Sequence, residues 1–192
     1  MSRPALLLSS LLLIACVPFS GIAQTPQSVR PTPDKQIFLT NALQGDLSAQ
    51  FWLGTGYEQG WFGKADYQEA LKWLRVAAKR GNPDAQNCLG QMYENGEGVA
   101  QNYAQAAKWY RKAAEHVPNL GGAGQGRNNL GLLYLGGHGV PKDVVHAYMW
   151  FRLADAEVNL SDAKAQMTAA QIREGERMVA DWIGSHPDRQ TH

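Results

Sequence analysis

The sequence LKWLRVAAKRG, from Leu71 to Gly81, is nearly repeated as AKWYRKAAEHV, from Ala107 to Val117. Both stretches place a Lys-Trp pair, an arginine and two alanines at matching offsets. When residues 45–80 are aligned with 81–116 without a gap, fifteen of 36 positions are identical. Only about two identities are expected by chance, so the sequence indicates an internal duplication.

A third copy follows at a shift of 41 residues from the second and retains its Leu-Gly, Tyr, Trp and Ala positions. The five extra residues fall within VPNLGGAGQG, residues 117–126. The glycine-rich part, GGAGQG at 121–126, lacks the Lys-Ser/Thr pair of a phosphate-binding loop, and no strand is expected before it. We interpret it as a flexible insertion between repeats.

Each copy has the signals of two antiparallel helices. Asn82 followed by Pro83 is a favourable helix start, and Gly96 stands where a left-handed C-terminal cap favours glycine. The second helix of each copy is expected to begin after Asp66, Asn102 or Asp143. Residues 34–44 continue the register backwards and predict a lone N-terminal cap helix. Residues 157–186 predict C-terminal cap helices, one of which begins with a Thr168–Gln171 capping box.

The predicted fold is therefore all-α: a short right-handed α-solenoid of three helix-turn-helix repeats with N- and C-terminal cap helices. The repeats are placed at 45–80, 81–116 and 117–156. Glycine costs about 1 kcal/mol inside a helix, and its recurrence in the three first helices predicts close approach of a neighbouring helix. We expect the tryptophan of the second helix to make this contact, buried between its own repeat and the next. These structural residues are Gly54, Gly90, Gly131, Trp73, Trp109 and Trp150.

The 36-residue period, the LG..Y..G.GV run and the A..W..KAA helix resemble the Sel-one-like repeat family, which is related to tetratricopeptide repeats. YMWFRLA at 148–154 and MTAAQI at 167–172 are similar to the closing segment of exported bacterial members. The resemblance implies an α-solenoid that binds proteins in envelope regulation, stress responses or host interaction. It implies no catalytic residues and no cofactor.

The N-terminus has the pattern of an export signal. Residues 1–23 contain one cation, Arg3, then an apolar run and a small-residue cleavage site, which predicts a cut between Ala23 and Gln24 and a periplasmic protein. The alternative is a lipoprotein, because LIAC at 13–16 resembles a lipobox in which Cys16 is lipidated and anchors the chain to the membrane. Residues 24–33 are expected to be a flexible proline-rich linker, and 187–192 a tail.

The hydropathy and the charge balance of the chain limit the classes of partner that it can bind. No further apolar run is long enough to span a membrane, so the mature chain is expected to have no transmembrane segment. Removal of Arg3 changes the balance of 18 Lys+Arg against 17 Asp+Glu to 17 against 17, so a nucleic-acid partner is not expected. Cys88 is interpreted as a small, semi-buried helix residue rather than a reactive thiol.

A protein or peptide partner is expected in the concave groove lined by the first helices. The candidate contacts are first-helix positions that lie outside the repeated frame and differ between copies. They are Phe51, Asn87 and Asn128; Thr55, Gln91 and Leu132; and Glu58, Glu94 and Leu135. The loop residues Trp61 and Phe62 either pack against the N-terminal cap helix or form an exposed anchor for a partner. A basic stripe on the second helices is interpreted as a solvated face, with a site for an acidic partner as the alternative. Its residues are Lys72, Arg75, Lys79, Lys108 and Arg111.

The sequence contains no recognisable set of catalytic residues. The sequence shows no Ser-His-Asp set and no carboxylate pair, and His138 and His146 lack further metal ligands at a suitable spacing. We therefore predict a non-enzymatic binding scaffold without cofactor or metal. The alternative is an envelope enzyme, such as a peptidoglycan-acting hydrolase.

Overall fold

The computed structural model describes residues 34–116 and 121–186. The predicted signal peptide, its cleavage site at Ala23 and Gln24, the lipidation site at Cys16, the linker and the C-terminal tail lie outside these residues. Within them the chain is all-helical, without a strand, and the predicted solenoid class is confirmed. None of the described helices combines the length and apolar character that a membrane crossing requires.

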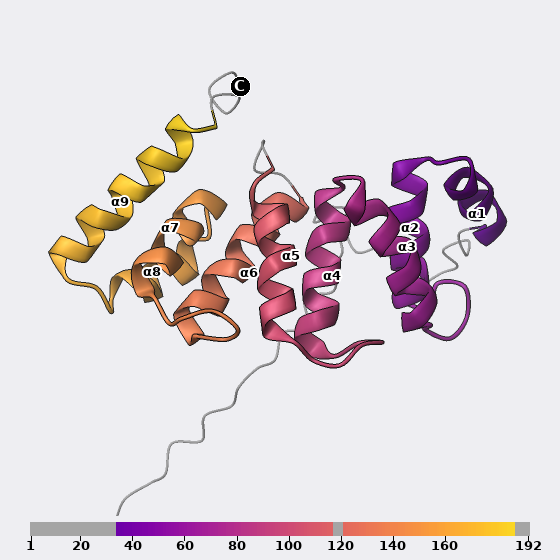
Figure 1. Ribbon diagram of the computed structural model, residues 1–192, viewed down its shortest axis with the longest axis horizontal. Coiled ribbons are helices and arrows are strands. Elements are labelled where there is room, and N and C mark those ends of the chain that lie inside the picture. Colours follow the sequence, from indigo (N-terminus) through magenta and orange to yellow (C-terminus); the bar gives the residue numbers. More distant parts are fainter. Residues whose placement is uncertain (1–33, 117–120, 187–192) are drawn as a thin grey trace, which may run out of the picture.

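The helices follow one another along the long axis of the molecule, and each packs against the next, except that the last helix packs against the helix two before it (Figure 1). Their order is a lone first helix, three antiparallel pairs and two closing helices. They are α1 (Lys35–Leu43); the pairs α2 (Leu47–Glu58) and α3 (Tyr67–Lys79), α4 (Pro83–Asn95) and α5 (Tyr103–Ala114), and α6 (Gly122–Gly136) and α7 (Val144–Ala154); then α8 (Glu157–Lys164) and α9 (Ala169–Gly184). Cys88 is buried in α4.

The helix ends follow local sequence signals. Asn82 caps α4 by accepting from the backbone N–H of Ala85 at 2.7 Å, and Gly96 ends that helix in the left-handed region with φ 76°. Asp66, Asn102 and Asp143 cap the second helices. Thr168 and Gln171 satisfy each other's backbone in the predicted capping box of α9.

A repeated close contact joins the two helices of each repeat. A β-carbon on Gly90 of α4 would lie 2.3 Å from the Tyr110 ring of α5, which is closer than real β-carbons come. The prediction that a tryptophan makes this contact is wrong. The side chain that lies against the glycine belongs to the residue immediately after the tryptophan. The contacting pairs are Gly54 with Leu74, Gly90 with Tyr110 and Gly131 with Phe151.

The three tryptophans are not equally buried. Trp73 and Trp150 are 8% and 7% exposed, as expected for core residues. Trp109 is less buried than the other two: it packs against the core cluster that contains Leu89 and Met92, but it remains partly exposed, with the Lys112 ammonium 4.6 Å from its ring centroid. Trp73 also shares a core cluster with Ala42 of α1, and therefore packs toward the preceding unit rather than the next.

A repeated side-chain hydrogen bond joins the first helix of each repeat to the end of the helix before it. At one repeated position a side-chain nitrogen donates to the backbone carbonyl of an alanine near the end of the preceding helix. The bonds are Gln50 Nε2 to Ala42 O at 3.0 Å, Gln86 Nε2 to Ala78 O at 3.0 Å, and Arg127 Nε to Ala114 O at 2.9 Å. These bonds link each repeat to the segment before it.

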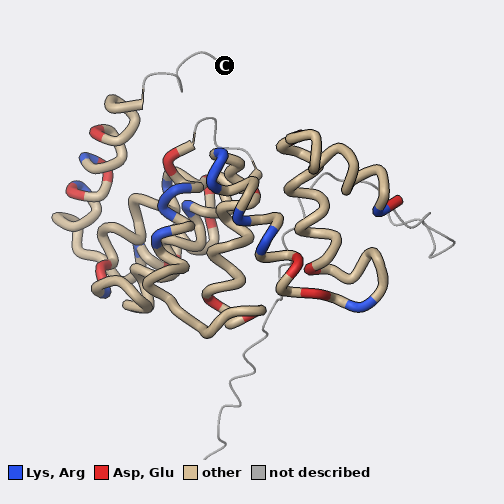
Figure 2. Tube along the Cα trace, turned by 45° about the vertical axis from the view of Figure 1, so that its right-hand side comes forward, with Lys and Arg blue, Asp and Glu red and all other residues tan. Residues whose placement is uncertain are grey.

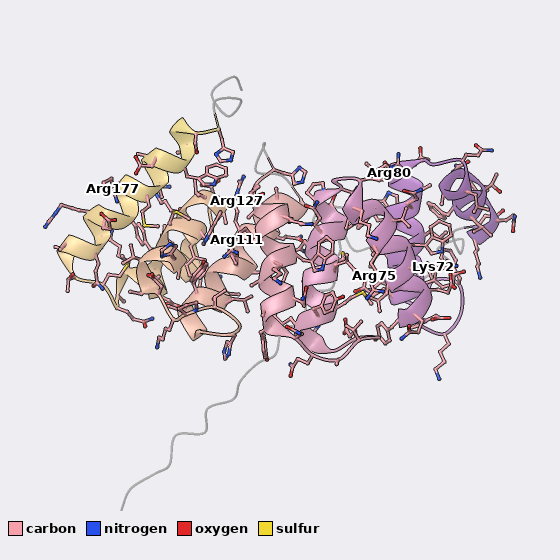
Figure 3. The ribbon with its side chains drawn as sticks, in the orientation of Figure 1. Lys72, Arg75, Arg80, Arg111, Arg127 and Arg177 are labelled. Atoms are coloured by element: carbon pink, nitrogen blue, oxygen red, sulfur yellow. The ribbon has the colours of Figure 1, made fainter. Side chains whose placement is uncertain are left out.

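Arginines of the second helices also bridge neighbouring repeats. Arg75 of α3 donates to the Tyr93 hydroxyl at 3.2 Å, and Arg111 of α5 donates to the Tyr134 hydroxyl at 2.9 Å (Figure 3). In each case the acceptor lies on the first helix of the next repeat. Part of the basic stripe predicted to be a solvated face therefore holds the solenoid together.

Replacing Gly90 with alanine should destabilise the fold, because Tyr110 is fully buried and its hydroxyl is held by Glu94, so the ring has no room to move. We expect Gly90→Ala to lower the free energy of unfolding by about 1–3 kcal/mol, the usual cost of overpacking. Urea unfolding followed by circular dichroism measures this. Gly184→Ala is the matched control, because a β-carbon there meets nothing within 4 Å. Equal stability of the two variants would contradict the close-contact interpretation.

Candidate binding site

A cleft of about 320 Å³ opens between the first helices of the second and third repeats. Its volume lies at the lower end of the range of small-ligand pockets. The lining comes from α4, from the first half of α6 and from the end of α7. The lining residues are Gln91, Gly124, Gln125, Asn128, Asn129 and Ala154. Four of these six side chains are carboxamides, and none is charged.

The position of α6 depends on α4. Gly121 offers α6 no side-chain cap, and instead the Asp84 carboxylate of α4 accepts from the backbone N–H of Gly122 at 2.7 Å. A β-carbon on Gly122 would lie 2.3 Å from the Pro83 carbonyl, so only glycine permits this approach. The interpretation of residues 121–126 as a flexible insertion is therefore wrong, since the helix begins at Gly122.

Three carboxamides form a directed chain across the back of the cleft. Asn129 Nδ2 donates to Asn87 Oδ1 at 3.0 Å, and Asn87 Nδ2 donates to Gln125 Oε1 at 2.8 Å. Asn87 of α4 is 1% exposed, and its two partners lie one turn apart on α6. The chain fixes the orientations of the three amide groups relative to one another, because reversing one of them alone would place two like groups against each other.

A fourth carboxamide is held from the C-terminal cap. Asn159 Nδ2 of α8 donates to Asn128 Oδ1 at 2.6 Å. This bond turns the amino group of Asn128 away from its partner, while Asn128 itself stays on the cleft lining. The cap helices therefore contribute to the site as well as closing the solenoid.

The structure brings only part of the predicted groove set to the cleft. Gln91 and Asn128 line it, Asn87 supports it from behind, and Leu132 lies nearby along α6 with 41% of its surface exposed. Gln125 and Asn129 were missed because the glycine-rich stretch was interpreted as a loop. A signal was present, since Gln125 stands one helical turn before Asn129 if the helix is extended backwards.

The first repeat differs from the expectation. Phe51 is 4% exposed and packs in the same core cluster as Leu89 and Met92 of α4, while Thr55 is fully buried. These two residues are therefore removed from the candidate binding surface. Leu135 is half-buried against the α7–α8 core, because the third copy has an apolar residue at the register of Glu58 and Glu94.

Glu58 and Glu94 occupy the same register but have different surroundings. Glu94 Oε2 accepts from the Tyr110 hydroxyl at 2.5 Å, and burial raises the pKa of that hydroxyl, so it remains a donor. The first repeat has Leu74 in place of Tyr110 and offers no such hydroxyl. Glu58 Oε2 is buried without a hydrogen-bond partner. Burial, and then the Glu97 carboxylate, raises the pKa of Glu58 to about 7.

The loop after α2 packs with aromatic residues on two sides. The Phe62 ring lies 6.4 Å from Phe38 of α1 and edge-on to Tyr57 at 5.5 Å, which is packing against the N-terminal cap helix. Trp61 stacks on Trp52 of α2 with 6.1 Å between ring centroids, and remains partly exposed. A partner-binding role for these two residues stays a prediction.

Charged side chains gather away from the cleft lining. Figure 2 shows lysines and arginines along the second helices, with acids beside some of them. Lys72, for example, contacts the Glu69 carboxylate at 3.2 Å. His146 bonds to its own N-cap Asp143 at 2.7 Å, and His138 stacks on Tyr103. Within residues 34–116 and 121–186 no cluster of metal-ligating side chains occurs.

The repeat family follows from comparison with known proteins. The Sel1 repeat matches at residues 47–82, 83–116 and 124–154, which together make up more than half of the chain. The chain belongs to the Sel1 repeat family. The resemblance read from the duplicated helices is therefore confirmed, and the three matched segments coincide with the three helix pairs. No curated protein matches the chain.

Solved structures of the same repeat are similar in fold. One is a protective antigen present in uropathogenic Escherichia coli strains, with a TM-score of 0.71 and 32% identity over 78% of this chain. Another is a Sel1 repeat protein from Oxalobacter formigenes, with a TM-score of 0.56 and 36% identity over 64% of this chain. The chain spans only 32% and 49% of the lengths of these two proteins.

The pKa of Glu58 gives a prediction for the pH dependence of stability. The folded chain holds this proton more tightly than the unfolded chain, whose carboxyl has the ordinary value of 4.5. The free energy of unfolding should therefore fall by up to about 3 kcal/mol as the pH rises between these two pKa values. Glu58→Gln should flatten that slope and stabilise the chain at pH 8, as measured by urea unfolding across pH.

Glu94→Gln is the matched control, because its side-chain oxygen can still accept from Tyr110. It should leave the slope between pH 4.5 and 7 as in the natural chain. An unchanged slope in Glu58→Gln would show that the buried carboxyl of Glu58 does not titrate in this range.

Proposed function

We propose that this protein is an exported interaction scaffold that binds a segment of a protein or peptide along its first helices, in the concave groove expected from the sequence. The Sel1 repeat fold is generally a protein–protein interaction scaffold. The single observation that supports this location is the carboxamide-lined cleft between α4 and α6. Its lining combines donors and acceptors, as a polypeptide ligand requires.

The chemistry of the cleft favours binding over catalysis. A hydrolase that acts on peptidoglycan would need a carboxylate pair or an activated nucleophile at the bound substrate. The cleft instead presents amides, which neither ionise nor act as nucleophiles at neutral pH. The Sel1 repeat family is typically a non-enzymatic scaffold. Envelope regulation, stress response or host interaction are the settings we propose for the partner.

Partner capture tests the location of the site. A photo-crosslinking residue placed at Leu132, beside the cleft, should capture a specific partner in cells, and one placed at Lys108 on the second-helix face should not. The double variant Gln91→Ala, Leu132→Ala should weaken binding of that partner at least tenfold without lowering the melting temperature, because both side chains are accessible.

The matched control removes positive charge from the second helices with Lys72→Ala and Lys108→Ala. Both lysines are exposed. Arg75 is left in place because it bonds to Tyr93. Full binding in the cleft double variant, together with loss in the lysine variant, would move the site to the second helices and refute the groove proposal.

Export is tested separately by intact-mass measurement. If the signal peptide is removed as proposed, the mature chain begins at Gln24 and carries no lipid. A diacylglycerol adduct on Cys16 would show instead a membrane-anchored lipoprotein.

A further inference from the structure

We infer that the cleft between α4 and α6 binds the main chain of an extended, internal peptide segment, with little dependence on the side chains of that segment. In this arrangement the amino groups of Gln125 and Asn128 donate to peptide carbonyls, and Asn129 Oδ1 accepts from a peptide N–H. The inference rests on the proposed function and specifies what the groove recognises.

The first argument is the direction of the amide network. Gln125 and Asn128 each have their oxygen occupied, by Asn87 and Asn159 respectively. Asn129 has its amino group occupied by Asn87. Among the described residues no partner is present for Gln125 Nε2, Asn128 Nδ2 or Asn129 Oδ1, and all three residues line the cleft. The cleft therefore presents two oriented donors and one oriented acceptor that are not yet satisfied.

The second argument is spacing. Gln125 and Asn129 lie four residues apart on α6, which corresponds to about 6 Å along a helix. In an extended chain, backbone groups that face the same side recur every second residue, about 6.8 Å apart. A donor and an acceptor separated by one helical turn therefore match the main-chain groups of a peptide that runs along α6.

The third argument is the absence of charge from the lining. Cationic side chains strengthen the binding of a chain terminus or an acidic side chain, and none lines the cleft. The nearest guanidinium on α6, Arg127, is fully buried and donates to the carbonyls of Ala114, His116 and Leu153 (Figure 3). The amides are therefore suited to the neutral interior of a peptide rather than to its C-terminal carboxylate.

The fourth argument is the small size of the other residues that line the cleft. Gly124 and Ala154 supply the remaining lining, so small residues stand where a ligand backbone must approach closely. The lining residues include no large apolar side chain that would select one ligand side chain. Affinity from such a site comes from main-chain hydrogen bonds, as in other modes of extended-peptide binding.

Side-chain NH2 signals in ¹⁵N NMR spectra of the full mature chain test the inference. The probe is the neutral hexapeptide acetyl-Ala-Ser-Ala-Ser-Ala-Ser-amide at millimolar concentration. We expect saturable shifts of the Gln125 and Asn128 amino signals. The same peptide with alternate amides N-methylated should bind at least tenfold more weakly, whereas a free C-terminal carboxylate should bring no gain.

Two conservative variants remove the amino groups proposed to bind the peptide and keep the hydrogen bonds between the carboxamides of the cleft. Gln125→Glu still accepts from Asn87, and Asn128→Asp still accepts from Asn159, but each loses its amino group. Each should weaken hexapeptide binding at least tenfold with an unchanged melting temperature. Gln105→Glu on α5 is the control, because it adds the same charge on a different helix, and its affinity should stay as in the natural chain.

Other outcomes overturn the inference. No shift with the hexapeptide, or equal binding of the N-methylated peptide, would refute main-chain recognition. A preference for the free carboxylate would make the cleft a terminus-binding site, and shifts with chitohexaose but not with the peptide would make it a saccharide site. If photo-crosslinking at Leu132 still captures a partner in these cases, the proposed function stands although the inference fails. If no partner is captured there either, both fail.

Discussion

The close approach of paired helices at Gly54, Gly90 and Gly131 is the constraint on which the rest of the solenoid depends. Each glycine lets the ring or branched side chain of the next helix lie against its backbone, so the two helices of a repeat are closer than a side chain at that position would permit. Successive pairs then stack tightly enough for short side chains to reach across repeats. The Asn87 amide of α4, for example, bonds to two carboxamides of α6.

The sequence predicted the fold well because its signals were local and repeated. Helix starts at Asn82 and Thr168, and the left-handed end at Gly96, depend on short-range hydrogen bonds that residue type largely determines. The neighbour of Gly90 was predicted less well. One residue along a helix turns the side chain by about 100°, so choosing Trp109 instead of Tyr110 selected the wrong face, and a pattern of identities cannot resolve that difference.

The site was less predictable because it depends on contacts between copies. Gln91 and Asn128 could be found as variable first-helix positions, but Gln125 became visible only once α6 was seen to begin at Gly122. That start is determined by Asp84, which lies 38 residues earlier in the chain. Burial of Phe51 and Thr55 likewise follows from packing against other segments, which a register comparison does not include. Composition suggested flexibility for a glycine-rich stretch that tertiary contacts make helical.

Arg127 has a consequence for the exchange of repeats between proteins. It stands where the first two copies have glutamine, and its guanidinium bonds to the carbonyls of Ala114 and His116 on one side and Leu153 on the other. It also lies 4.8 Å from the centroid of the Trp182 ring of α9. The third copy is thus bound to the segment before it and to the closing helix through one side chain. Although the three copies descend from one unit, their order is fixed: a recombination that moved the third copy to another position would bury a cation without its four neighbours.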